Sequence, residues 1–195
     1  MATKIAQPSA RQRLLDAALK RFARDGAMAA TLEEIRADAG VSVGALYHHF
    51  ADKAALAGTL YVETLRGYQQ GFLEVLDANP EAEAGIRAAV RHTLDWCSKH
   101  PAEARLLFGG RGDADTAALA EINRDFFSRA ARWYWGHAHY GVLRPLEFPL
   151  VSSLWLGPTL DHLRHWLHSG EKTVSDETAE ILAEAAWRAL RKDQT

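Results

Sequence analysis

The sequence contains very little cysteine, and polar residues interrupt its apolar residues at short intervals. Cys97 is the only cysteine, which excludes an intramolecular disulfide, and an isolated cysteine does not form a zinc framework. We expect it to be a small buried thiol, since free cysteines are usually buried. No apolar run approaches the roughly 20 residues that a membrane-spanning helix needs, and residues 1–9 lack the apolar core of a secretory signal. These absences favour a cytoplasmic protein with no membrane partner.

Two common motifs of catalysis and of phosphate binding are also missing. The sequence has no His-Glu-x-x-His zinc motif and no Gly-x-x-x-x-Gly-Lys phosphate loop. Nine histidines raise the question of a metal site, above all His162, His165 and His168. Spacings of three residues spread these rings along an arc of a helix that offers two ligands but rarely three. We therefore predict surface or interface histidines, no metal, no cofactor and no enzymatic activity.

Charge is distributed unevenly, although the net charge is only −2. Residues 1–25 hold six Lys or Arg against two Asp or Glu, whereas residues 54–195 hold fifteen against nineteen. A basic end on an acidic body suits contact with phosphates at one end of the molecule. Ordinary surface variation explains the same distribution, so charge alone leaves both interpretations open.

Helical periodicity runs through nearly the whole sequence, and no convincing alternating strand appears. Ser-x-x-Gln at 9–12 and Thr-x-x-Glu at 31–34 have the form of capping boxes, and Ser42 and Asp52 are N-cap candidates. The fold class is therefore all-α. We predict three short helices, then a connector helix over 53–78. Further helices are expected at about 80–99, 101–109, 114–140, 147–168 and 175–192, with a break at 109–112 and a kink near Gly157-Pro158.

Residues 31–50 have the pattern of a helix-turn-helix centred on Gly40. The chain turns sharply there, and glycine tolerates a positive φ. The apolar residues are spaced to fill the wedge between the two helices, which frees the other face of the second helix; they are Ile35, Ala39, Val41 and Leu46. A plain helical hairpin whose rings pack against each other is the alternative explanation.

The second of these helices has little bulk at its start and several polar rings at its end. Gly44 and Ala45 lie in its first turn, where small side chains permit close approach to a DNA major groove. Tyr47 and His48 are placed to reach flanking phosphates or bases. Lys53 adds a positive charge and a helix-end amide for a phosphate. This composition fits a helix that sits close to a duplex.

The whole string T-x-x-x-I-x-x-x-A-G-V-S-x-G-x-L-Y-x-H-F-x-x-K-x-x-L, from Thr31 to Leu56, resembles the DNA-binding domain of the TetR/AcrR family of bacterial transcriptional regulators. The resemblance implies an all-α protein with a helix-turn-helix domain at 9–55, joined by the connector helix to a ligand and dimer domain at 79–195. It also implies the DNA contacts. Thr31 and Lys53 correspond to phosphate contacts, and the recognition element consists of Ser42, Val43, Gly44, Ala45, Tyr47, His48 and His49.

Arg36 departs from the family pattern, which usually has a small residue such as alanine after the Ile35 position. An arginine does not fit a tight contact between helices. We expect either that its side chain leaves sideways or that the helices splay apart, which would change how the recognition helix docks.

The C-terminal region resembles the family more loosely. A dense set of aromatic residues could line an apolar pocket for a small effector: Trp96, Phe108, Phe126, Trp133 and Trp155. A packed aromatic core is the alternative. The apolar helices at 147–168 and 175–192 would pair with their twofold copies in a homodimer, although an intramolecular core explains their pattern equally well.

These observations predict a regulator that binds a palindromic DNA operator as a homodimer and releases it when a small, largely apolar effector binds. Repression is the default that the resemblance implies. The alternative is a helical small-molecule-binding protein or enzyme that never binds an operator.

Overall fold

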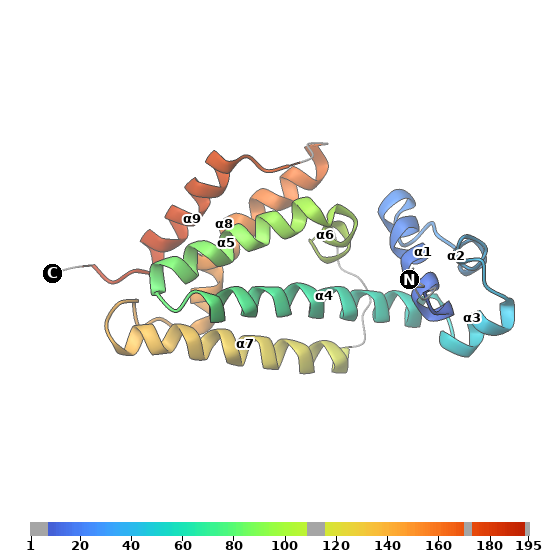
Figure 1. The fold of residues 1–195 in the computed structure, drawn as a ribbon, viewed down its shortest axis with the longest axis horizontal. Helices are drawn as coiled ribbons and strands as arrows, with labels where there is room; N and C mark the ends of the chain where they lie inside the picture. The colour runs from blue at the N-terminus through green and yellow to red at the C-terminus, as the bar shows by residue number, and fades with distance from the viewer. Residues whose placement is uncertain (1–7, 109–115, 170–172, 194–195) are drawn as a thin grey trace, which may run out of the picture.

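The structure, a computed structural model, describes residues 8–108, 116–169 and 173–193. This part of the chain folds into nine α-helices (Figure 1). They are α1 (Ala10–Asp25), α2 (Leu32–Ala39), α3 (Val43–His49), α4 (Lys53–Ala78), α5 (Ala82–Lys99), α6 (Pro101–Phe108), α7 (Thr116–His139), α8 (Phe148–Ser169) and α9 (Asp176–Leu190). The all-α prediction is confirmed, and the predicted helices match the observed ones closely. The predicted break at 109–112 lies outside the described residues.

Side-chain caps fix where the first helices begin. The Thr31 hydroxyl accepts from the Glu34 amide, and the Glu34 carboxylate accepts from the Thr31 amide, so the predicted capping box is complete. Ser42 and Asp52 accept from amides three residues on and cap α3 and α4. Ser9 caps α1, but the Gln12 side chain donates to Asp16 and does not accept from the Ser9 amide as the second hydrogen bond of a capping box would require.

Two glycines end the first two helices where the backbone turns. Gly26 follows α1 with φ 82°, and Gly40 follows α2 with φ 62° in the left-handed region, a conformation that costs glycine little. Further along the chain, α8 continues through Pro158. The helix is therefore unbroken at the Gly157-Pro158 pair.

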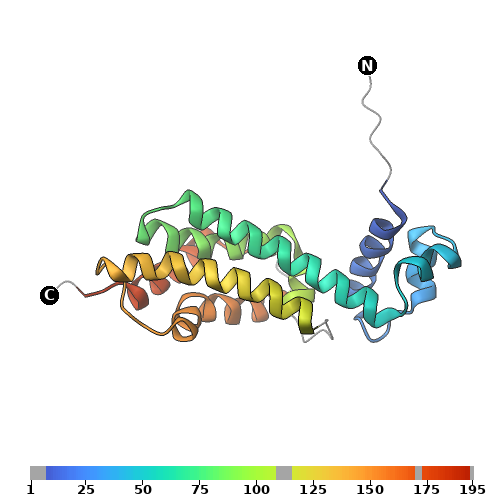
Figure 2. The ribbon, with the colours of Figure 1, turned by 90° about the horizontal axis from the view of Figure 1, so that it is seen from below.

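The long helix α4 belongs to two helical bundles, one with α1 to α3 and one with α5 to α9, and α6 of the second packs against α1 of the first (Figures 1 and 2). At its N-terminal end α4 packs with α1, α2 and α3 around a small core that includes Leu14, Ile35 and Leu46. Further along, it packs with α5 to α9 around a larger core. Leu60 belongs to the first core and Tyr68 to the second, so α4 is shared by both.

Aromatic side chains from α4 lie at the middle of the larger core. The Tyr68 ring contacts Trp96 at 5.2 Å between centroids and Phe108 at 5.7 Å. The Phe72 ring contacts Phe126 at 5.4 Å and Trp155 at 5.7 Å. The indole N–H of Trp155 donates to the carbonyl of Ile86 at 3.1 Å, so α8 is tied to the backbone of α5.

The single cysteine lies in the same core. Cys97 is fully buried, as expected, and burial raises the pKa of its thiol to about 12.

Within the described residues no helix is long and apolar enough to cross a membrane. The same residues contain no group of three or more His, Cys, Asp or Glu side chains arranged to hold a metal ion.

Candidate nucleic-acid interface

Helix α3 presents one exposed face at the end of the molecule farthest from α9 (Figure 1). Its other face is anchored by Leu46 and Phe50, which are buried in the small core. Val43 is 53% exposed and Tyr47 is 58% exposed, large fractions for apolar and aromatic side chains. A Cβ built on Gly44 would meet no atom within 4 Å. The backbone of this first turn is therefore open to a partner surface.

The remaining predicted recognition residues lie on or beside the same face. Ser42, His48 and His49 are exposed and Ala45 is half-buried. The Ser42 side chain accepts a hydrogen bond from the Ala45 amide, so it shapes the start of the helix. Thr31 is exposed at the start of α2 and donates its hydroxyl to Glu34 at 2.8 Å. Short helices with capped N-termini thus bring all the predicted residues of α2 and α3 to one end of the bundle.

Lys53 has a different environment from the one expected for a phosphate ligand. Its Nζ atom lies 3.1 Å from the carbonyl oxygens of Ala27 and Met28 and 3.0 Å from that of Ala30. An ammonium group has three N–H donors, and here each has a backbone acceptor. Lys53 therefore holds the loop between α1 and α2 against the start of α4. This role was not predicted from the sequence.

Arg36 leaves the helix interface sideways, one of the two outcomes expected for it. Its guanidinium donates to the Glu33 carboxylate through Nε at 3.0 Å and through Nη2. Its Nη1 atom donates to the carbonyl of Val41 at 2.7 Å. The bulky side chain is thus accommodated along α2 and across the turn rather than between the helices.

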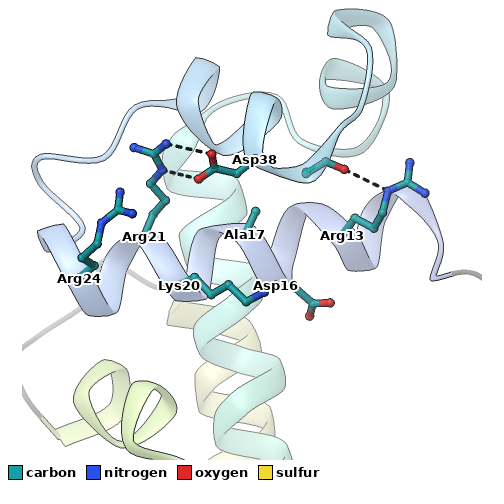
Figure 3. Close-up of a pocket in the computed structure, with 8 residues that line it drawn as sticks. Arg13, Asp16, Ala17, Lys20, Arg21, Arg24 and Asp38 are labelled. Carbon is teal, nitrogen blue, oxygen red and sulfur yellow. Dashed lines mark hydrogen bonds and ion pairs between the residues drawn. The ribbon is translucent and has the colours of Figure 1, made fainter.

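A charged groove of about 420 Å³ runs along α1 beside the end of α2 (Figure 3). Its lining includes Arg13, Lys20, Arg21, Arg24, Asp16 and Asp38. Arg21 donates to Asp38 at 2.5 and 3.0 Å, and this pairing lowers the pKa of the Asp38 carboxyl. Arg13 donates to the carbonyl of Ala39 at 3.1 Å. Arg13 and Arg21, two of the six basic residues of segment 1–25, therefore hold α1 to α2.

The segment Gly40-Val41-Ser42-Val43-Gly44 also has the letters of the Gly-x-Ser-x-Gly motif of hydrolases. That motif requires a serine on a sharp turn between a strand and a helix, with histidine and carboxylate partners. Here the serine caps a helix that follows another helix. The match is therefore to the letters of the motif and not to its structure.

Four of the five residues predicted to line an effector pocket contact Tyr68 or Phe72 of α4, and the fifth, Trp133, packs against Trp155. Trp155 and Phe126 are buried, and Trp96, Phe108 and Trp133 are half-buried. Trp96 also lines two surface grooves of about 400 and 300 Å³, one along α4 and α5 and one between α1, α4, α5 and α6. Tyr68 and Phe72 were not among the residues predicted from the sequence to line the pocket. Their spacing of four residues on a helix could have indicated a shared aromatic face.

The N-terminal bundle matches a known protein family. The family model described as "Bacterial regulatory proteins, tetR family" matches residues 14–60, which run from α1 into α4. AcrR of Shigella flexneri, an HTH-type transcriptional regulator, is 41% identical over 59 residues, which are 30% of this chain and 27% of AcrR. The residues that the family model matches include the exposed face of α3.

Two further similarities extend over nearly the whole chain. FasR of Mycolicibacterium smegmatis, an HTH-type transcriptional activator, is 25% identical over 190 residues, which cover 92% of this chain and 82% of FasR. The crystal structure of a TetR family transcription regulator from Marinobacter aquaeolei VT8 has a TM-score of 0.76 at 21% identity, covering 94% of this chain and 96% of that one. At such identity the structural likeness shows the fold alone.

Proposed function

Because the chain belongs to the TetR family of bacterial transcriptional regulators, we propose that it binds a palindromic operator as a homodimer and releases it on binding a small effector. The observation that carries this proposal is the exposed first turn of α3, where Gly44 leaves the backbone open beside Val43 and Tyr47. Two such helices related by a twofold axis would enter major grooves about 34 Å apart.

The predicted DNA-contacting residues divide into three proposed groups. Val43, Gly44 and Ala45 would approach base edges in the major groove, because they stand in the first turn of the recognition helix. Ser42, Tyr47, His48 and His49 would contact bases or the adjoining backbone. Thr31 would contact a phosphate, which fixes the register of the protein on the duplex but carries no sequence information. Lys53 would attract phosphates through its positive charge, since its three N–H donors already bond backbone carbonyls. Lys53 would also act indirectly, through the loop that it fastens.

We propose that the homodimer forms through α8 and α9. Leu150 on α8 is 49% exposed and Ile181 on α9 is 62% exposed. The inner face of α9 is buried within the chain through Ala183, Ala186 and Leu190. Each helix thus has one large apolar side chain exposed in the single chain, which a four-helix bundle between two copies would cover.

The proposed effector is a small, largely apolar molecule that binds among Trp96, Phe108, Phe126, Trp133 and Trp155. Four of these rings touch Tyr68 or Phe72 of α4, and α4 begins at Lys53 beside the recognition helix. A ligand that displaces these rings would move α4 and change the separation of the two recognition helices. For this to release DNA, the ligand must prefer the non-binding conformation.

We propose that the protein represses transcription, although the relative FasR is named as an activator.

In vitro selection from randomised duplexes tests the DNA-binding part of the proposal. We expect the purified protein to enrich a near-palindrome and to bind it as a dimer. Selection of no sequence, or of a single asymmetric half-site, would overturn it.

Tryptophan fluorescence with a panel of small apolar molecules tests the effector part. We expect at least one molecule to change the fluorescence and to weaken operator binding about 5–150-fold, a usual range for coupling between sites. A ligand that quenches the tryptophans but leaves operator affinity unchanged would contradict the proposed release. A reporter gene under the selected operator then distinguishes repression from activation.

A further inference from the structure

Arg36 and Val41 are joined by a reciprocal pair of hydrogen bonds across the turn of the helix-turn-helix. The guanidinium Nη1 donates to the carbonyl of Val41 at 2.7 Å. In the opposite direction, the Val41 amide donates to the carbonyl of Arg36 at 3.3 Å. The Arg36 side chain is only 23% exposed. The turn is therefore closed by both the backbone and the side chain of one residue.

The closed turn leads directly into the recognition helix. Val41 is buried, and the next residue, Ser42, caps α3. Gly40, in the left-handed region, has no side chain of its own with which to hold the turn. The direction in which α3 leaves α2 thus depends on contacts made by neighbouring residues to the carbonyls of the turn.

Two further contacts hold the same turn. Glu33 bonds two nitrogens of the Arg36 guanidinium, and this pairing raises the pKa of Arg36 and lowers that of Glu33. On the other side of Gly40, Arg13 donates to the carbonyl of Ala39. One arginine from α1 and one from α2 therefore hold the carbonyls on either side of the glycine.

We propose that Arg36 is a positioning residue for operator recognition: its bond to the Val41 carbonyl sets the orientation of α3 in the major groove. This inference rests on the proposed function. It assigns to Arg36 no contact with DNA, because each of its three guanidinium nitrogens already donates to Glu33 or Val41. The bases are read by the exposed residues of α3, and Arg36 determines where those residues stand.

Four variants test the assignment. Arg36→Ala removes the bond to Val41, and Arg36→Lys keeps a donor that can reach the same carbonyl. Glu33→Ala keeps the bond to Val41 but removes the carboxylate. Arg24→Ala is the control for loss of one positive charge, since Arg24 is 65% exposed and pairs with the adjacent Asp25. All four lie on exposed or half-buried helix positions, and thermal unfolding establishes that each is folded.

The DNA probes are the duplex that the wild-type protein selects from a randomised library and a mixed-sequence duplex of equal length. We expect Arg36→Ala to lose about tenfold in affinity for the selected duplex, equivalent to about 1.4 kcal/mol. Its affinity for the mixed duplex and the dependence of binding on salt should stay unchanged. Arg36→Lys should recover part of the loss, Glu33→Ala should lose less than Arg36→Ala because it keeps the bond to Val41, and Arg24→Ala should keep the wild-type ratio between the two duplexes.

Three outcomes would overturn the assignment. An equal loss on both duplexes, with a salt slope smaller by about 1, would make Arg36 a phosphate contact. A lower melting temperature with an unchanged ratio between the duplexes would make it a purely structural residue. A loss of discrimination in Arg24→Ala equal to that in Arg36→Ala would assign the effect to net charge. Failure of the wild-type protein to select any sequence would overturn the proposed function instead, so the two failures are distinguishable.

Discussion

The Nζ atom of Lys53, at the first residue of α4, lies 3.0 Å from the carbonyl oxygen of Ala30, next to the N-cap of α2. Two more carbonyls of the same loop accept from it. We expect Lys53→Ala to weaken binding to all duplexes alike, because it removes a positive charge near the phosphates and frees the loop that leads into α2. It should also lower the free energy of unfolding by about 1 kcal/mol, a usual net contribution for a hydrogen bond.

Binding titrations on selected and mixed duplexes, together with urea unfolding, measure both effects. Lys20→Ala is the charge-matched control, since Lys20 is exposed on α1 and no contact to the loop is expected from it. A changed base preference in Lys53→Ala with intact overall affinity would contradict this prediction.

Gly44→Leu should fold normally and fail to bind its operator. A Cβ at this position meets no atom within 4 Å, and the φ angle is not positive. In the free protein the added side chain therefore points into open space, but in the complex it would occupy the gap between the helix backbone and the bases. Conservative changes at Val43 or Ala45 should instead alter base preference, measured by repeating the selection. If Gly44→Leu bound the operator with normal affinity, the first turn of α3 would not be the surface that contacts DNA.

The local features of the fold were predictable from sequence because they depend on residues a few positions apart. The capping box of Thr31 and Glu34 and the turn at Gly40 each require only one short segment. The face of α3 followed in the same way, since burial of Leu46 and Phe50 leaves Val43 and Tyr47 outside.

The partners of long polar side chains were not predictable. Lys53 and Ala27 are 26 residues apart in the chain, as are Arg13 and Ala39. Whether a lysine beside a helix N-terminus binds a phosphate or backbone carbonyls depends on where a distant loop passes. Arg36 could leave its helix in several directions, and the Val41 carbonyl determined which one.

Two helical glycines in the C-terminal bundle should respond to alanine with opposite signs. A Cβ on Gly85 would lie 2.3 Å from Cζ2 of Trp133, so Gly85→Ala must displace the indole and should lower the free energy of unfolding by about 1–3 kcal/mol. Gly136 has open space around it, so Gly136→Ala should raise that free energy by about 0.5–1 kcal/mol. Urea unfolding followed by circular dichroism measures both, and equal signs would contradict the packing of Trp133 on α5.

Ile181→Glu should disrupt the homodimer without unfolding the subunit. The side chain is 62% exposed in the single chain, so a charge there costs a monomer little, whereas a charge buried between two copies is expensive. Sedimentation equilibrium should show a shift toward monomer and operator binding should weaken. Met28→Glu is the matched control for sedimentation, since Met28 is 93% exposed in the loop between α1 and α2, away from α8 and α9 (Figure 1). A dimer of unchanged stability would place the interface on other helices.

Acidification should destabilise the protein through His92. The ring stacks on Tyr68 with centroids 6.0 Å apart, and its Nε2 atom is buried without a hydrogen-bond partner. Burial lowers the pKa of His92, opposed by a hydrogen bond to the Tyr68 backbone and by Asp95 and Glu74, with Lys99 acting in the direction of burial. Because the folded pKa lies below the unfolded value of about 6.5, the unfolded chain binds a proton first as the pH falls. The free energy of unfolding should therefore decline below about pH 6.5, until the pH passes below the folded pKa.

His92→Phe keeps a ring against Tyr68 but cannot bind a proton, so its stability should fall less steeply than that of the wild type between pH 7 and the folded pKa. A residual slope is expected from His137, whose pKa burial also lowers. His165→Gln is the control, because it removes a histidine whose side chain is 83% exposed and should leave the slope of the wild type. Urea unfolding at a series of pH values measures all three proteins. Equal slopes for the wild type and His92→Phe would mean that His92 is solvated well enough in the folded protein to accept a proton at no cost.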